Sequence, residues 1–500
     1  ICGVWAGLLG ASPDLAPLRE AWETLLLLQF HDILPGSSIG QVYAEAAEDH
    51  ARIARTATSV RDDALSAVVA EAGGADLVAV NTLSWPRQDV AEATIPAPAG
   101  EVEIVSADGR AWPAQVLSRE EGRARIAFSA EAPAMGVAGF VVRPAAAPAE
   151  HTLHSASDCL ESSAFRLEIS PDGAITRLLD KRVGREVVPP GEIANDLQLL
   201  QDGPEREAAW NVHDTMDKRR YAWDEGATVE GVERGPVRAA VRVTRTYRES
   251  RLVQDIVLYD RLPRVDFFTR VDWQERQVLL KAAFPVAVRS ARATYEVQFG
   301  AVERPTHRNT SWDASKFEVA AHHWADLSEA GYGVSLLNDC KYGYDAQGHV
   351  LRLTLLRGAE WPDPDADRGH HAFTYSLLPH PGGWDEGETV RRAWELNVPI
   401  LTAAGGGRGE PAPARSFLSV EGPAILTACK PAEDGRGVIL RLYEPHGGRG
   451  TVRVAAPRPL ERVVACNLVE EDAEDVASEG SAFTFPIGPF QIRTFRVWWR

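Results

Sequence analysis

The sequence is poor in cysteine and contains no long apolar run. Its 500 residues include five scattered cysteines with no Cys-x-x-Cys spacing, which excludes a disulfide framework or a thiolate metal site. We expect the cysteines to be small buried side chains in a reducing compartment, the cytoplasm. No run of roughly 18 apolar residues and no charged-then-apolar leader occurs, so neither a membrane span nor a signal peptide is expected.

Positive charge is also scarce, because 53 Lys and Arg stand against 71 Asp and Glu and give a formal net charge of −18. This balance disfavours binding to a phosphate backbone, so no nucleic-acid partner is expected. The length corresponds to about three or four domains, and 45% hydrophobic residues suffice for large cores. The chain begins at Ile1 without a methionine, and we expect it to be a fragment of a longer protein.

The clearest helical periodicity lies in the first 72 residues. Apolar residues recur at helical spacing over residues 14–30 and predict a buried helix. They are Leu15, Leu18, Trp22, Leu25 and Leu26. A Pro-Gly turn then ends the helix, and a second apolar series predicts a long amphipathic helix over residues 39–70, capped by Ser37 or Ser38. Residues 1–72 are therefore expected to form a helical, three-helix-bundle-like domain that is truncated at its start.

From residue 77 onward, short runs rich in β-branched and alternating residues lie between Pro-, Gly- and Asp-rich turns and predict strands. We expect a small β-sandwich over residues 76–145, a large β domain over 150–402 and a further β domain over 408–500. Pro/Ala-rich and Gly-rich stretches mark the linkers between them. The expected fold class is α+β and multidomain, with a helical unit followed by mainly β domains.

The turn between the two predicted helices carries His31 and Asp32, and three interpretations of this pair stay open. His31 is a hydrogen-bonded core histidine in the first, with Asp32 capping a turn. In the second, Gly36-Ser37-Ser38-Ile39-Gly40 is a nucleophile elbow around Ser38, although such an elbow requires a preceding strand. In the third, the imidazole binds a metal and the carboxylate accepts a hydrogen bond from a sugar hydroxyl.

The residues around this pair resemble glycoside hydrolase family 38, the class II α-mannosidases, in their cytosolic-type form. The segment Gln-Phe-His-Asp-Ile-Leu-Pro-Gly-Ser-Ser, residues 29–38, is similar to the signature of the family's middle domain. Further similar blocks lie in the family's order at residues 81–87, 282–286, 293–300, 303–313, 337–344, 362–369 and 373–375. The resemblance covers most of the chain and implies a galactose-mutarotase-like supersandwich for its large β domain.

The resemblance also implies a function. His31 would ligate one divalent metal, Zn²⁺ with Co²⁺ as an alternative, and Asp32 would contact the mannose. The activity implied is that of a metal-dependent retaining α-mannosidase that hydrolyses terminal α-mannosyl residues of oligosaccharides. The nucleophile and the acid/base belong to the family's N-terminal domain, so no catalytic residue is expected here and the fragment alone should be inactive. A homo-oligomer, such as a tetramer, is implied as well; the alternative function is a non-catalytic carbohydrate-binding or scaffold protein.

Two further stretches add candidate residues. The acidic turn Asp363-Pro-Asp-Ala-Asp-Arg-Gly369 lacks the later glutamate of a calcium loop. By the resemblance it supports the sugar subsite, which makes Asp365 and Arg368 candidate substrate-binding residues. Asp202 and Trp210 lie in a stretch that is similar to another block of the family.

Overall fold

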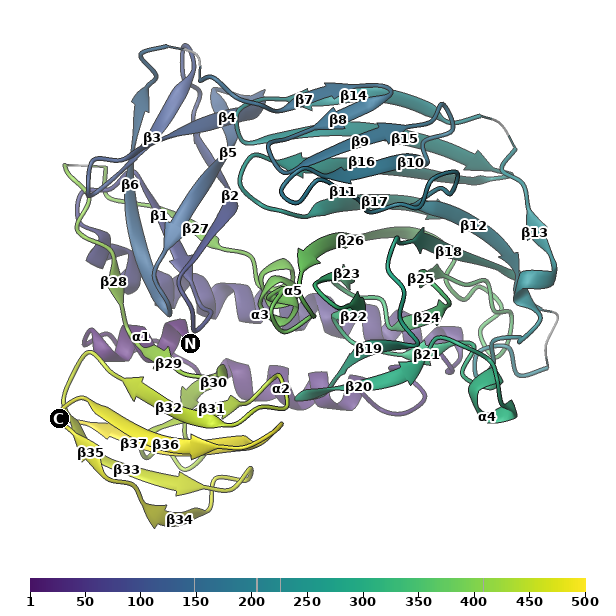
Figure 1. Ribbon diagram of the computed structural model, residues 1–500. Coiled ribbons are helices and arrows are strands. Elements are labelled where there is room, and N and C mark those ends of the chain that lie inside the picture. The colour runs from purple at the N-terminus through teal and green to yellow at the C-terminus, as the bar shows by residue number, and fades with distance from the viewer. Residues whose placement is uncertain (148, 204–205, 225, 408) are drawn as a thin grey trace.

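The computed structural model describes residues 1–500 except 148, 204–205, 225 and 408, and the chain runs through it as a helical unit followed by β domains (Figure 1). The expected fold class is thereby confirmed. The expected start of the last domain, residue 408, lies outside the described residues. No helix in the described part of the chain is both long and apolar enough to cross a membrane.

The helical unit contains α1 (Cys2–Leu8), α2 (Pro17–Leu28), α3 (Gly40–Val69) and the short 3₁₀ turn η1 (Ala70–Ala72). The predicted helix–turn–helix is present, but the expected burial of the first of these two helices is wrong. In α2 only Leu28 is buried, and the side chains of Trp22, Leu26 and Leu27 are 60–63% exposed. The apolar face that the periodicity identified is only partly covered: Leu15, Leu18 and Leu25 are half-buried, whereas Trp22, Leu26 and Leu27 are exposed.

The predicted cap of α3 is also wrong. The N-cap residue is Ile39, which makes no side-chain capping hydrogen bond. Ser37 is buried, and its hydroxyl donates instead to the Asp32 carboxylate over 3.2 Å. The helix therefore begins beyond both serines, and the Ser37 side chain serves the preceding loop, where its hydroxyl contacts Asp32.

The small β domain is built on one antiparallel sheet, in the order β2-β5-β4-β3-β6-β1-β27 with β28 added to β6. Phe128 of β5 and Phe140 of β6 are not on neighbouring strands, yet their rings meet edge to face at 5.8 Å, so the sheet curls around its own core. Its last two strands follow the large domain in sequence. The strands are β1 (Leu77–Asn81), β2 (Arg87–Pro96), β3 (Val102–Ser106), β4 (Ala111–Glu120), β5 (Arg123–Ala132), β6 (Gly136–Pro144), β27 (Leu401–Ala404) and β28 (Arg415–Ser416).

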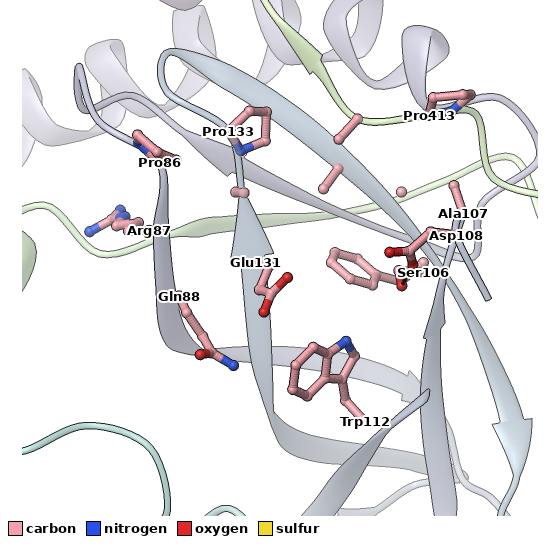
Figure 2. A pocket seen from close by; sticks show the side chains of 15 residues that line it. Pro86, Arg87, Gln88, Ser106, Ala107, Asp108, Trp112, Glu131, Pro133 and Pro413 are labelled. Atoms are coloured by element: carbon pink, nitrogen blue, oxygen red, sulfur yellow. Dashed lines mark hydrogen bonds between the residues drawn. The ribbon is translucent and has the colours of Figure 1, made fainter. Parts of the chain in front are cut away.

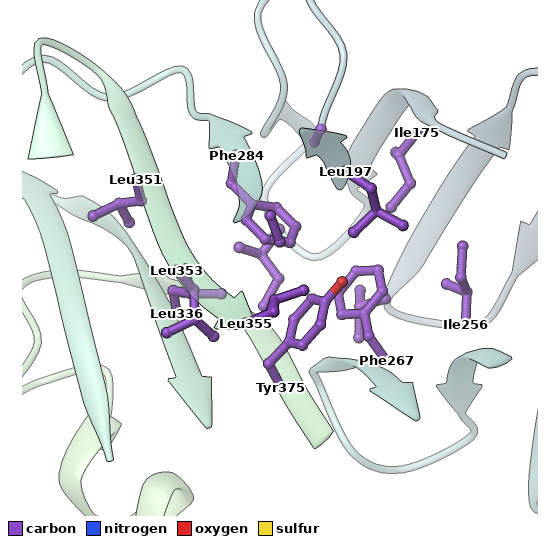
Figure 3. Close-up of a cluster of buried hydrophobic side chains, with 14 of the residues drawn as sticks. Ile175, Leu197, Ile256, Phe267, Phe284, Leu336, Leu351, Leu353, Leu355 and Tyr375 are labelled. Carbon is purple, nitrogen blue, oxygen red and sulfur yellow. The ribbon is translucent and has the colours of Figure 1, made fainter. Parts of the chain in front are cut away.

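The large domain stacks antiparallel sheets around an apolar core (Figure 3). Phe267 stacks on Tyr375 at 4.9 Å and meets Phe284 edge to face at 5.6 Å. The first sheet contains β7 (His154–Ala156), β8 (Cys159–Glu161), β9 (Phe165–Ile169), β10 (Ile175–Asp180) and β11 (Arg185–Glu186). The second contains β12 (Asp196–Gln201), β13 (Arg220–Tyr221), β18 (Val278–Pro285), β21 (Val319–Ala320), β24 (Gly343–Gln347) and β25 (Val350–Leu356).

The third and widest sheet of this domain runs in the order β14-β15-β16-β17-β26-β23-β22-β19-β20. Its strands are β14 (Thr228–Arg234), β15 (Arg238–Tyr247), β16 (Ser250–Tyr259), β17 (Val265–Trp273), β19 (Arg292–Val297), β20 (Gly300–Pro305), β22 (Trp324–Glu329), β23 (Tyr332–Asn338) and β26 (Gly369–Pro381). Short helical pieces lie between strands: η2 (Met216–Lys218), α4 (Ser311–Ala314) and α5 (Thr389–Asn397). In α5, the buried Glu395 accepts a 2.9 Å hydrogen bond from the Trp85 indole, which joins the small domain to this helix.

The C-terminal domain is a sandwich of two sheets, β29-β32-β36-β35 and β30-β31-β37-β33-β34. It lies against the helical unit (Figure 1), and the two share a core in which Trp5 of α1 stacks on Phe417 at 4.8 Å. Its strands are β29 (Ser419–Glu421), β30 (Ile425–Pro431), β31 (Val438–Tyr443), β32 (Gly450–Ala455), β33 (Leu460–Cys466), β34 (Asp472–Asp475), β35 (Ser478–Glu479), β36 (Ala482–Ile487) and β37 (Ile492–Trp499).

All five cysteines are free, as expected, but their expected burial holds only in part. Cys2 and Cys429 are buried, whereas Cys159 and Cys466 are half-buried and Cys340 is exposed. Cys340 lies two residues beyond the end of β23, in the segment that leads to the next strand. The neighbouring residues in the sequence did not predict this exposure, because the burial of a residue near a strand end depends on which other segments pack over that end.

Candidate functional site

The His31–Asp32 pair lies in an open loop between α2 and α3. The His31 side chain is 77% exposed, which contradicts the interpretation of a buried core histidine. Its Nε2 atom is 3.5 Å from Oδ2 of the half-exposed Asp32. The nucleophile-elbow interpretation is wrong as well, because the helix α2, and not a strand, leads into the turn that contains Ser38. An imidazole and a carboxylate are thus presented side by side on the surface of this chain.

Tyr43, on the first turn of α3, holds this loop in place. Its hydroxyl donates to the Asp32 carbonyl oxygen over 3.0 Å and accepts the backbone N–H of Ser38 over 2.8 Å. Burial raises the pKa of Tyr43, and the carboxylates of Asp363 and Asp32 raise it further. The phenol therefore stays protonated at neutral pH, as its donor role requires. This role of Tyr43 was not predicted from the sequence. The position of a tyrosine one turn beyond a polar loop was the feature of the sequence that could have indicated it.

Asp363 of the large β domain reaches the same place from the other side. A Cβ added at Gly40, the first residue of α3, would lie 2.9 Å from Oδ1 of Asp363, so the glycine allows this close approach. The helix has no side-chain cap of its own, and a carboxylate at its positive N-terminal end is electrostatically favourable. The acidic turn therefore lies beside the His31–Asp32 loop. Asp363 is the residue of that turn that approaches Gly40 and Tyr43.

The two predicted residues of that turn are engaged mainly with each other and with their own domain. One oxygen of Asp365 accepts both Arg368, over 2.8 Å, and Arg276, over 2.7 Å. Arg368 also donates to Gln274 over 3.2 Å. These exposed pairs are individually weak in water, so both side chains are able to exchange partners. Their role in substrate binding stays a prediction.

A metal ion would find only part of its ligand set here. Zinc in proteins takes four ligands in structural sites and at least three protein ligands in catalytic ones. Among the residues that the structure describes, no group of three or more His, Cys, Asp or Glu side chains is placed to hold a metal. His31 fits as one imidazole ligand because its ring is exposed. Among the described residues this place therefore offers an imidazole with one neighbouring carboxylate, fewer ligands than a zinc site requires.

The Tyr43 clamp leads to a first prediction. Tyr43→Phe removes one donor and one acceptor at the loop, and we expect it to lower the free energy of unfolding by about 1–2 kcal/mol. Urea unfolding measures the change, and hydrogen exchange of the Ser38 amide should become faster. Tyr342→Phe, at an exposed tyrosine, is the matched control. Unchanged exchange at Ser38 would show that the phenol does not hold the loop.

A pocket of about 630 Å³ opens elsewhere, in the small β domain (Figure 2). Its lining includes Trp112 of β4 and Glu131 of β5. The guanidinium groups of Arg110 and Arg261 lie 4.5 and 4.7 Å from the Trp112 ring centroid. These contacts occupy the ring faces that a sugar would need for stacking, and Glu131 is paired with Arg110 over 2.8 Å. We therefore assign the site to the His31 loop and not to this pocket.

Comparisons with known protein families match three stretches of the chain. The description "Alpha mannosidase middle domain" matches residues 6–68, which contain the His31 loop. "Glycosyl hydrolases family 38 C-terminal domain" matches residues 160–365, and "Glycosyl hydrolases family 38 C-terminal beta sandwich domain" matches residues 423–495. These matches cover the helical unit, most of the large β domain and the C-terminal sandwich, in the order in which the structure joins them.

Individual proteins give the same result. "Alpha-mannosidase 2C1" of Homo sapiens is 35% identical over 497 residues, covering 95% of this chain and 45% of that protein. An "Alpha-mannosidase" of Saccharomyces cerevisiae is 28% identical over 519 residues, covering 96% of this chain and 43% of that protein. The chain thus spans less than half the length of these relatives. A solved structure of a family 38 protein from Enterococcus faecalis shares the fold, with a TM-score of 0.80 at 16% identity over 99% of this chain and 68% of that one.

Proposed function

Because the chain belongs to glycosyl hydrolase family 38, of which it carries the middle and C-terminal domains, we propose that it is one part of a metal-dependent retaining α-mannosidase. Its substrate would be an oligosaccharide with terminal α-mannosyl residues, and its location the cytoplasm. The observation that carries the proposal is the meeting of two family domains at one point. The His31–Asp32 loop of the middle domain lies beside the acidic turn of the large β domain.

Within this proposal each side chain has a limited task. His31 would supply one ligand to a zinc ion, or to cobalt, which accepts the same imidazole donor. A bound divalent metal orients and polarises sugar hydroxyl groups. Asp32, whose Oδ1 is held by the Ser37 hydroxyl, would accept a hydrogen bond from one such hydroxyl. Asp365 and Arg368 would contact the sugar from the large β domain.

A retaining glycosidase also needs two carboxyl groups, one as nucleophile and one as acid/base. We propose that these come from residues outside this chain. The uncovered apolar face beside the site supports this, because Leu26, Leu27 and Phe30 are more than half exposed next to His31. Apolar patches of this kind mark surfaces that another protein part covers.

The proposal is tested by comparing this chain with the full-length gene product that contains it. We expect the full-length protein to hydrolyse an aryl α-mannoside, and the chain alone to show no turnover and no more than weak zinc binding. An assay of the two proteins mixed together serves as a control for inhibitors in the preparations. Hydrolysis by the chain alone would overturn the assignment of the carboxylates to another part of the protein. A full-length protein that binds mannosides without hydrolysing them would favour a carbohydrate-binding function.

A further inference from the structure

Two tryptophan side chains meet on the surface next to the acidic turn. Trp210 is 50% exposed and Trp361 is 49% exposed, and their ring centroids are 5.2 Å apart with the planes tilted by 44°. Indoles carry a large apolar surface that is normally buried, and each member of this pair leaves about half of that surface exposed. This exposed apolar surface is available to a ligand.

The loop that carries Trp210 is firmly anchored. The guanidinium group of Arg357 binds both oxygens of the buried Asp202 at 2.9 Å. It also donates to the backbone carbonyls of Ala208, over 2.8 Å, and Asn211, over 2.6 Å, on either side of Trp210. One buried ion pair therefore fixes the backbone before and after the exposed indole.

The segment of Trp361 is tied to the same framework. The N–H of Ala209 donates to the Trp361 carbonyl oxygen over 3.2 Å, which links the two indole-bearing segments directly. Gln277 donates its N–H to the carbonyl oxygen of Gly358 over 2.7 Å and accepts the N–H of Asp202 at its own carbonyl over 2.9 Å. The two rings are exposed but pre-organised, and pre-organisation lowers the entropic cost of binding a ligand.

The position of the pair relates it to the proposed sugar site. Trp361 precedes Asp363 by two residues, so their Cα atoms are at most about 7 Å apart. Asp363 in turn lies against Gly40 and within electrostatic reach of Tyr43, which holds the Asp32 loop. Charged side chains belong to the same two segments: Glu207 precedes Trp210 by three residues, and Glu360, which precedes Trp361, is paired with Arg276 over 3.3 Å. A pyranose ring offers an apolar C–H face to an indole and hydroxyls to such a rim.

We propose that Trp210 and Trp361 form a stacking subsite for the sugar ring next to the terminal mannose of an α-linked oligosaccharide. This inference rests on the proposed α-mannosidase function and goes beyond it. It implies that this chain helps the enzyme to prefer oligosaccharides over substrates that have no second sugar. The subsite would act through binding, because neither indole is placed to transfer a proton.

The test uses the full-length gene product and two substrates, an α-linked mannotriose and α-mannosyl fluoride, whose leaving group cannot reach a stacking platform. We expect Trp361→Ala and Trp210→Ala each to raise KM for mannotriose roughly three- to tenfold with little change in kcat. The kinetics with mannosyl fluoride should stay unchanged. Trp361→Phe should restore part of the loss, and Trp312→Ala, at a tryptophan that is 80% exposed, is the control.

Each other outcome contradicts a stated part of this scheme. Unchanged KM for mannotriose in both alanine variants of an active parent would overturn the subsite alone. Equal losses on both substrates would also overturn it, since they would show that the indoles shape the protein and not the oligosaccharide site. A parent inactive on both substrates would overturn the α-mannosidase function and the subsite with it.

Discussion

His31→Ala in the full-length gene product is expected to lose α-mannosidase activity and bound zinc together, with activity falling by at least roughly 100-fold. The reason is geometric and local. The His31 side chain is 77% exposed at the tip of a loop, so its removal leaves no cavity and breaks no core contact. A large effect on activity with little effect on folding is what an exposed metal ligand predicts.

The measurement combines hydrolysis of an aryl α-mannoside, zinc content by atomic absorption, and thermal unfolding. His370→Ala is the matched control, because this histidine of β26 is 88% exposed and is paired only at 3.7 Å with Asp272. Its activity and zinc content should equal those of the parent. If His31→Ala retains both activity and metal, the histidine is not a ligand and the active site has to be placed without it.

Lys281→Met is expected to destabilise the large β domain by roughly 3–5 kcal/mol, the cost of leaving buried charges unpaired. The Lys281 ammonium group on β18 is completely buried and donates to the carboxylates of Glu318 and Asp345. Arg352 binds Asp345 over 2.9 Å, so the negative charge of Asp345 stays partly neutralised when Lys281 is removed. Glu318 would keep only the hydroxyl of Thr354 as its partner.

The pH dependence provides the sharper test. Burial already raises the pKa of Glu318, although the Lys281 ammonium group opposes the shift. Without Lys281 that pKa rises further above its value in the unfolded chain. A raised carboxyl pKa means that the folded state binds the proton more tightly, so stability is present at low pH and is lost as the pH rises through the folded pKa. The deficit of Lys281→Met should therefore be larger at about pH 8 than at about pH 5.

Urea unfolding of the chain at both pH values measures this, with the transition midpoint as the readout. Lys316→Met, at an exposed lysine, should stay within about 0.5 kcal/mol of the parent. Adding Glu318→Gln to Lys281→Met should restore part of the stability, because a neutral amide replaces the unpaired carboxylate. A pH-independent deficit with no rescue would show that lost packing of the lysine stem, and not unpaired charge, causes the effect.

Local chemistry explains what could be predicted from the sequence. The spacing of apolar residues predicted the helix pair α2 and α3, and the Pro-Gly turn placed His31 and Asp32 between them. These features depend on residues a few positions apart, and neighbours in the chain are neighbours in any fold. The family relationship rests likewise on contiguous blocks of sequence, which is why it could be recognised and why the comparisons confirm it.

Burial and capping were less predictable because they depend on the exact path of the chain and on what packs against it. The N-cap of α3 is Ile39 and not a serine, and the Ser37 hydroxyl donates to Asp32 in the preceding loop. The apolar face of α2 had the pattern of a core helix, yet Trp22, Leu26 and Leu27 are left exposed on it. Periodicity shows that a face prefers to be covered, whereas only the tertiary structure shows what covers it.

The sequence by itself thus determined the helix–turn–helix, the position of the His31–Asp32 loop within it and the family to which the chain belongs. The tertiary structure alone decided that Asp363 approaches Gly40 from another domain, that Tyr43 clamps the loop, and that Trp210 meets Trp361. The first set follows from interactions between near neighbours in the chain. In the second set, the approach of Asp363 to Gly40 and the contact of Trp210 with Trp361 join segments separated by some 150 to 320 residues, whose meeting depends on how whole sheets pack around their cores. The Tyr43 clamp joins residues only 5 and 11 positions apart, and it depends on how the loop folds back onto the first turn of α3.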